Sequence, residues 1–88
     1  MKIVDGFLLR HIGKQYFVVP TGANAKNING AIELNEVAAC IWEQLQTNVS
    51  REHIIATIVS EFRESQEEVT SDVDEFLEQL RILDLLID

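Results

Sequence analysis

The chain changes its hydrophobic pattern once, at Leu34. Before that residue the apolar side chains come in short runs separated by turn residues, which is typical of strands. After it they recur at spacings of three and four residues, which is the pattern of amphipathic helices. The two patterns meet at Leu34, Asn35 and Glu36 without a spacer. The sequence therefore predicts an α+β fold in which strands come first and helices follow.

Two strands of a hairpin are expected near the amino end. The segments Phe7 to Ile12 and Tyr16 to Val19 are rich in apolar and aromatic residues, and Gly13 between them takes the positive φ that a tight turn needs. Pro20 ends the second strand because it has no amide to donate to a ladder. The segment from Thr21 to Ala25 is a loop by composition.

A third strand is expected from Asn27 to Leu34. Ile28 and Ile32 lie on one face of this extended segment, and Gly30 lies on the same face between them. Glycine there leaves a bare spot where another backbone can approach. A strand of this kind, with no second neighbour evident in the sequence, is suited to the addition of an extended peptide as an extra strand.

Three helices follow, each with a start signal. Asn35 and Ser50 are caps of the first two, since their side-chain oxygens accept from free amides, and a capping box begins at Ser65. The first helix is expected from about Glu36 to Gln46, and the third ends near Leu83. Phe76 is large enough to serve both the core and an interface, because it lies at the middle of the helix expected to flank the sheet edge. The other residues expected to face the core are Ala38, Ile41, Trp42, Leu45, Ile54, Ile55, Ile58, Val59, Phe62, Val69, Val73, Leu77, Leu80 and Leu83.

The order of elements defines the expected architecture. A three-stranded antiparallel sheet followed by three helices (β-β-β-α-α-α) is a winged helix-turn-helix type of fold. The tail Leu85-Leu86-Ile87 is too apolar to be left in water, so we expect it to pack under the sheet or to form a short strand.

The length and composition of the chain limit the functions that it can have. Residues 1–88 are expected to form one domain, and a domain this small buries only about 60 to 65% of the surface of its unfolded chain, so a deep substrate pocket is hard to fit. Neither a signal peptide nor a membrane span is apparent, and a single cysteine cannot form an internal disulfide. The expected location is the cytoplasm.

The charge disfavours nucleic acid as a partner. The net charge is -8, and the segment from Glu64 to Asp88 holds nine acidic residues against one basic residue, Arg81. Such a surface repels phosphate backbones, whose binding depends on Lys and Arg.

Few residues offer catalytic or metal chemistry. Cys40, His11 and His53 are the only thiol or imidazole groups, and they fall on three separate elements without the short spacings of a zinc site. Cys40 lies in an apolar helix, where cysteine commonly acts as a small hydrophobe. We therefore expect neither a metal, nor a cofactor, nor a catalytic residue.

The carboxylates of the third helix have two readings. Asp72, Glu75 and Glu78 lie on its outer face, and such a run is usually a solvated surface. Alternatively, some of them line a groove and select a basic segment of a partner.

Five short motifs follow one another along the chain: Gly6-Phe7-Leu8-Leu9-Arg10, Tyr16-Phe17-Val18-Val19-Pro20, Leu34-Asn35-Glu36, Ile41-Trp42 and the acidic-apolar stretch Val73 to Leu86. In this order and spacing the chain resembles, over nearly its whole length, the family of coenzyme PQQ synthesis protein D (PqqD), also called RiPP recognition elements. Two positions depart from the family pattern: Val37-Ala38 stands where Thr-Gly is frequent, and Asp84 stands where a helix-ending glycine is common.

The resemblance implies a non-catalytic peptide-binding module. Family members bind the leader segment of a ribosomally made precursor peptide and present it to a modifying enzyme, often a radical SAM enzyme. By this analogy the leader would add as a strand and contact the third helix. The residues so implied are Asn27, Ile28, Asn29, Gly30, Ala31, Ile32, Val69, Asp72, Val73, Phe76, Gln79 and Leu80.

The resemblance leaves several points open. The product is either PQQ or another modified peptide, and the chain is either a monomer or a dimer. The alternative role is that of a winged-helix protein interaction or transcription-regulatory domain. The acidic third helix disfavours transcription regulation through DNA, because carboxylates repel the phosphate backbone.

Overall fold

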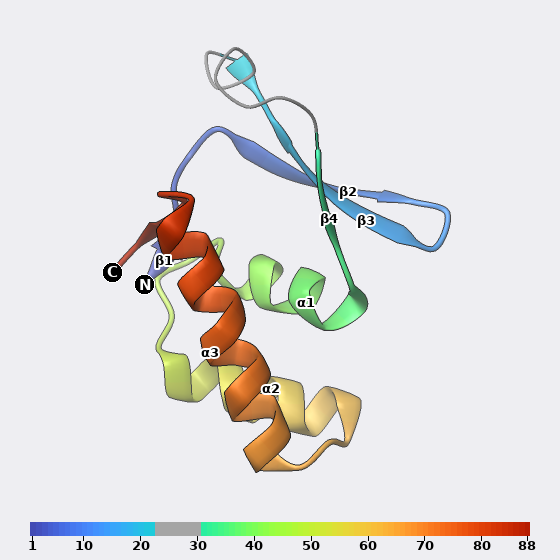
Figure 1. Cartoon of the computed structure of the whole chain (residues 1–88), viewed down its shortest axis with the longest axis vertical. Helices are drawn as coiled ribbons and strands as arrows, with labels where there is room; N and C mark the ends of the chain where they lie inside the picture. Colours follow the sequence, from blue (N-terminus) through green and yellow to red (C-terminus); the bar gives the residue numbers. More distant parts are fainter. Residues whose placement is uncertain (23–30) are drawn as a thin grey trace.

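The computed structural model describes residues 1–22 and 31–88. Figure 1 shows a sheet at one end of the molecule and α2 at the other, with α1 between them. Within the described chain the elements are β1 (Lys2–Ile3), β2 (Phe7–Ile12), β3 (Gln15–Pro20), β4 (Ile32–Leu34), α1 (Glu36–Gln44), α2 (Arg51–Phe62), α3 (Gln66–Ile82) and β5 (Leu86–Ile87).

The main sheet is antiparallel, in the order β2-β3-β4. Gly13 has a φ of 63° in the β2–β3 turn, so the predicted hairpin is confirmed. β4 lies at the edge of the sheet and pairs only with β3 among the described residues, with Ile32 opposite Val18. β4 is the carboxyl-terminal part of the predicted third strand; Asn27 to Gly30 lie outside the described residues.

The predicted helix starts are confirmed. The amides three residues further along the chain donate to Asn35 Oδ1 at 2.8 Å, to Ser50 Oγ at 3.1 Å and to Ser65 Oγ at 3.2 Å. Each bond satisfies an amide that has no partner inside its own helix. Three polar residues therefore fix where α1, α2 and α3 begin.

The core lies between the sheet and the three helices. Trp42, Leu45 and Ile58 are buried, as the helical spacing predicts. Leu83 is an exception, because 53% of its surface is exposed. The prediction that Leu83 faces the core was wrong, since α3 ends at Ile82 and Leu83 is its cap, where the helical spacing no longer sets the direction of the side chain.

The two ends of the chain meet in a second, two-stranded sheet. β1 pairs antiparallel with β5, and Ile3 lies opposite Leu86 (Figure 1). Leu85 is 2% exposed and Ile87 is 50% exposed, so the apolar tail is buried only in part, and its last two residues form a short strand, which is one of the two predicted outcomes. The turn before it places Asp84 at a φ of 58°, the left-handed conformation that glycine takes more readily.

Candidate functional site

A groove with a volume of about 470 Å³ lies between the edge strand β4, α1 and α3. β4 contributes Glu33 and Leu34 to its lining, and α3 contributes a stripe of side chains. The residues that line the groove are Glu33, Leu34, Asn35, Val37, Ala38, Ile41, Glu64, Asp72, Glu75, Phe76 and Gln79.

The stripe of α3 in the groove follows from helical spacing. Asp72, Glu75, Phe76 and Gln79 are separated by three, four and seven residues, so they lie on one face of the helix. The neighbouring stripe of α3 is buried in the core and includes Val73, which has no exposed surface. α3 therefore holds the fold together with one stripe and lines the groove with the next.

The groove combines an apolar floor with acidic sides. Val37, Ala38 and Ile41 of α1 contribute aliphatic side chains, and Leu34 continues this surface from β4. The acidic side chains of the groove belong to Glu33, Glu64, Asp72 and Glu75. We refer to the space of about 470 Å³ that these four carboxylates line as the acidic section.

A narrower space of about 70 Å³ continues the groove, since it shares Glu33, Leu34, Phe76 and Gln79 with the acidic section. Apart from these shared residues, its lining is apolar. We refer to it as the apolar section, which is lined in addition by Val18, Ile32, Trp42, Leu80, Leu83 and Leu85. The exposure of Leu83, unexpected from the sequence, places it at this part of the groove.

The predicted site residues are distributed unevenly around the groove. Asp72, Phe76 and Gln79 line the acidic section, where they belong to the stripe of α3 in the groove. Ile32 and Leu80 line the apolar section. The other predicted residues do not line either section in the described chain: Val69 and Val73 are buried in the core, Ala31 is exposed immediately before β4, and Asn27, Ile28, Asn29 and Gly30 lie outside the described residues.

Sequence reasoning missed the contribution of α1. Val37, Ala38 and Ile41 line the groove, whereas the helical spacing had placed Ala38 and Ile41 in the core. Ile41 does both, since it is 1% exposed and still forms part of the groove floor. The signal that could have found them is their position directly after the strand, because a helix that begins at the end of an edge strand lies next to that edge.

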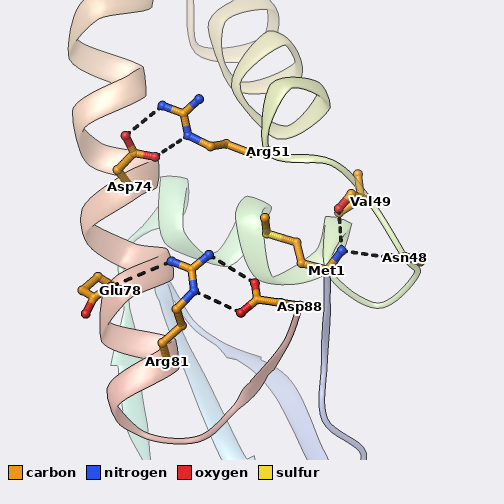
Figure 2. A network of polar contacts seen from close by, with 8 residues as sticks. All are labelled: Met1, Asn48, Val49, Arg51, Asp74, Glu78, Arg81 and Asp88. Atoms are coloured by element: carbon orange, nitrogen blue, oxygen red, sulfur yellow. Dashed lines mark hydrogen bonds and ion pairs between the residues drawn. The ribbon is translucent and has the colours of Figure 1, made fainter.

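The basic residues that pair with α3 lie away from the groove. Arg51 Nε is 2.6 Å from Asp74 Oδ1, and Arg81 pairs with Asp88 at 3.2 Å and with Glu78 at 3.8 Å (Figure 2). None of these residues lines the acidic section. Among the described residues, the acidic section contains neither Lys nor Arg.

The thiol of Cys40 is not set up as a nucleophile. Burial, together with a hydrogen bond to Glu61 and the charge of that carboxylate, raises the pKa of Cys40 to about 11. Cys40 Sγ donates to Glu61 Oε2 at 3.5 Å, and neither residue lines the groove. The thiol therefore stays protonated near neutral pH, and the protonated form is a weak nucleophile.

Residues 1–22 and 31–88 contain no group of three or more His, Cys, Asp and Glu placed to hold a metal ion. No helix in the same ranges is long and apolar enough to cross a membrane.

The fold and the groove define a small winged helix-turn-helix type of domain in which β4, at the edge of the sheet formed by the described residues, lies beside the groove that α3 also lines. The family of coenzyme PQQ synthesis protein D (PqqD) matches residues 13–86, and the chain belongs to this family. A solved structure, TbiB1 in complex with the TbiA(beta) leader peptide, has the same fold, with a TM-score of 0.76 and 24% identity over 100% of both chains. No curated protein matches the sequence significantly.

Proposed function

We propose that residues 1–88 act as a single, non-catalytic domain that binds the leader segment of a ribosomally made precursor peptide. The observation that carries this proposal is the edge of β4, which has no further strand paired to it among residues 1–22 and 31–88 and lines the same groove as α3. The peptide would add to β4 as a further strand, with alternate side chains directed into the groove.

The physical basis is strand addition. An edge strand presents backbone amides and carbonyls that need partners, and an extended peptide supplies them whatever its sequence. Selection then depends on the side chains that enter the groove, where Phe76 is half-buried and Gln79 is exposed. α3 has 17 residues and is about 25 Å long, so a segment of about seven extended residues would run along it.

Family membership and the solved relative support the ligand class. TbiB1 has the same fold and was solved with a leader peptide, and the match extends over the whole of both chains. By analogy with the family, we propose that the modifying enzyme is a radical SAM enzyme, which would bring its own cofactor. The proposed role is the same whether the final product is PQQ or another modified peptide. It is also the same whether the chain acts as a monomer or as a dimer.

The alternative of a DNA-binding winged helix is not favoured. Such a role needs a basic recognition helix, whereas α3 holds six acidic residues and one basic residue, Arg81, in a chain whose net charge is -8. A duplex would meet the carboxylates of α3 before it met any base edge.

The test is amide chemical-shift mapping with the leader of a short peptide encoded beside this chain. The proposal expects the largest shifts in Ile32 to Leu34 and in the stripe of α3 that contains Phe76. A scrambled peptide of the same composition is the control. Shifts confined to α2, or no binding of any leader, would refute the proposal.

A further inference from the structure

We propose that the groove selects a lysine or arginine in the bound segment, close to a bulky apolar residue. The basic side chain would occupy the acidic section, and the apolar one would enter the apolar section. The inference rests on the function proposed above and adds the chemistry of the peptide that the groove accepts.

The first support is charge complementarity. The acidic section has four carboxylates, from Glu33, Glu64, Asp72 and Glu75, and no Lys or Arg among the described residues that line it. Within the described chain, the group that contacts one of these carboxylates is the neutral amide of Gln15, whose Nε2 donates to Glu33 Oε1 at 3.3 Å. A cation in the bound peptide would therefore meet carboxylates that no described cation pairs with.

The second support is the floor beneath these carboxylates. Lysine and arginine have long aliphatic stems that pack along apolar surface while the charged head stays at a polar rim. Val37 and Ala38, which are half-buried, offer such a surface in the same space that the four carboxylates line. A purely solvated acidic face has no apolar floor, so this combination favours binding of a basic side chain over simple solvation.

The geometry limits the spacing of the two selected residues. Along α3 the acidic section is represented by Asp72 and Glu75, and the apolar section by Leu80 and Leu83. Eight residues of helix, from one pair to the other, correspond to about 12 Å. Side chains on one face of a strand recur about every 6.7 Å, so the basic and apolar residues of the peptide would be four positions apart, about 13 Å.

The charges are expected to act mainly on selection. Exposed ion pairs contribute little to affinity, and complementary charge mostly raises the association rate and rejects partners of the wrong sign. An acidic segment would be rejected by the same four carboxylates. The groove would thus discriminate among peptides that all form the same backbone ladder with β4.

The experiment begins with a display library of random 16-residue peptides, selected on the full chain. The inference expects enriched sequences to carry more Lys and Arg than Asp and Glu, with a bulky apolar residue four positions from a basic one. An enriched peptide is then measured against two double variants. Asp72→Asn with Glu75→Gln removes two charges inside the groove, and Glu67→Gln with Glu78→Gln removes two charges from α3 outside it.

The two double variants have the same net charge, so long-range effects cancel between them. The variant Asp72→Asn with Glu75→Gln should bind the peptide about threefold to tenfold more weakly than the unchanged chain. The control variant Glu67→Gln with Glu78→Gln should bind it less than about twofold more weakly. Replacing the peptide's lysine by norleucine keeps the aliphatic stem and removes the charge. With that peptide the groove variant should bind as well as the unchanged chain, which completes a double-mutant cycle.

The outcomes separate this inference from the proposed function. Peptides that bind at β4 without a bias toward basic residues, or equal weakening by both double variants, would overturn the inference and leave the proposed function standing. Failure of the chain to bind any library peptide or leader would overturn both. Circular dichroism melts of each variant establish that the comparison is made between folded proteins.

Discussion

Arg51 and Asp74 join the first turn of α2 to the middle of α3 through two bonds, Nε to Oδ1 at 2.6 Å and Nη2 to Oδ2 at 2.9 Å (Figure 2). This planar, two-bonded geometry is the strongest form of a surface ion pair. It connects the two helices on the side of α3 that lies away from the groove. α3 is thus held by its core stripe and by this pair, while its groove stripe stays open.

The contribution of the Arg51–Asp74 pair to stability should depend on pH. The hydrogen bonds from Arg51 hold the pKa of Asp74 below its ordinary value. A carboxylate with a lowered folded pKa adds stability above its unfolded pKa of about 3.9, and this contribution is lost as the pH falls through the folded value. Asp74→Asn should therefore lower the melting temperature slightly at pH 7 and lose its effect in acid.

The check is a set of thermal melts of the unchanged chain, Asp74→Asn, Arg51→Gln and the double variant at pH 7 and near pH 3. A positive coupling between the two sites at pH 7 that shrinks in acid is expected. The pair is solvent-exposed, so high salt should reduce the coupling as well. A coupling that is independent of both pH and salt would contradict this account.

Cys40 is expected to be structural. Its folded pKa of about 11 lies above that of an unfolded thiol, so the stability associated with the protonated thiol is complete below about pH 8.5 and is lost as the pH rises toward 11. Alkylation by iodoacetamide at pH 8 should be slow compared with the unfolded chain. Cys40→Ala should cost about 1 kcal/mol, as a small cavity does, and leave peptide binding unchanged. Rapid alkylation of the folded chain, or loss of binding, would show that the thiol has another role.

Arg63 ends α2 with a φ of 52°, a left-handed conformation that costs a non-glycine residue energy. Arg63→Gly should relieve this cost and raise the free energy of unfolding by about 0.5 to 1 kcal/mol. Arg63→Ala is the matched control, because it removes the same side chain but keeps the Cβ. Urea unfolding of both variants decides the matter: equal effects would assign any change to the lost side chain instead of the backbone.

Local signals predicted most of the fold. The caps at Asn35, Ser50 and Ser65 and the turn at Gly13 each depend on one residue and its near neighbours, so the sequence contains all that is needed to place them. The pairing of β1 with β5 is different. Each of these strands has two residues, and the two strands lie at opposite ends of the chain. No local sequence pattern therefore predicts that they pair.

The groove shows where sequence patterns lose resolution. Helical spacing puts Val73 and Phe76 on the same apolar side of α3, yet Val73 is fully buried and Phe76 lines the groove. The difference depends on how far the neighbouring elements cover the helix, which is a property of the packing. The contribution of Ala38 and Ile41 depends in the same way on how α1 lies beside β4.

Phe76 should contribute to peptide binding more than to stability. It lines both sections of the groove and is only half-buried, so Phe76→Ala should cost less than the roughly 3 to 5 kcal/mol of a fully buried phenylalanine. Binding of the leader should weaken by at least about tenfold, since a large aromatic group at the centre of an interface is a typical hot spot. Val59→Ala, a half-buried aliphatic position on α2 outside the groove lining, is the control for lost stability. Equal loss of binding in both variants, measured by calorimetry on chains shown to be folded, would mean that Phe76 acts only through the fold.

Addition of the peptide as a strand can be tested at Ala31, the residue immediately before β4. Ala31 is exposed and directly precedes the edge strand, and a proline there would lack an amide and obstruct an added ladder. Ala31→Pro should therefore reduce leader affinity by about tenfold or more, while the edge position lets the fold survive. Ala31→Ser keeps the amide and should bind nearly as well as the unchanged chain. Calorimetric titration with the leader gives both affinities, and circular dichroism verifies both folds. If the proline variant is folded and binds as tightly as the serine variant, the peptide does not pair with this end of β4.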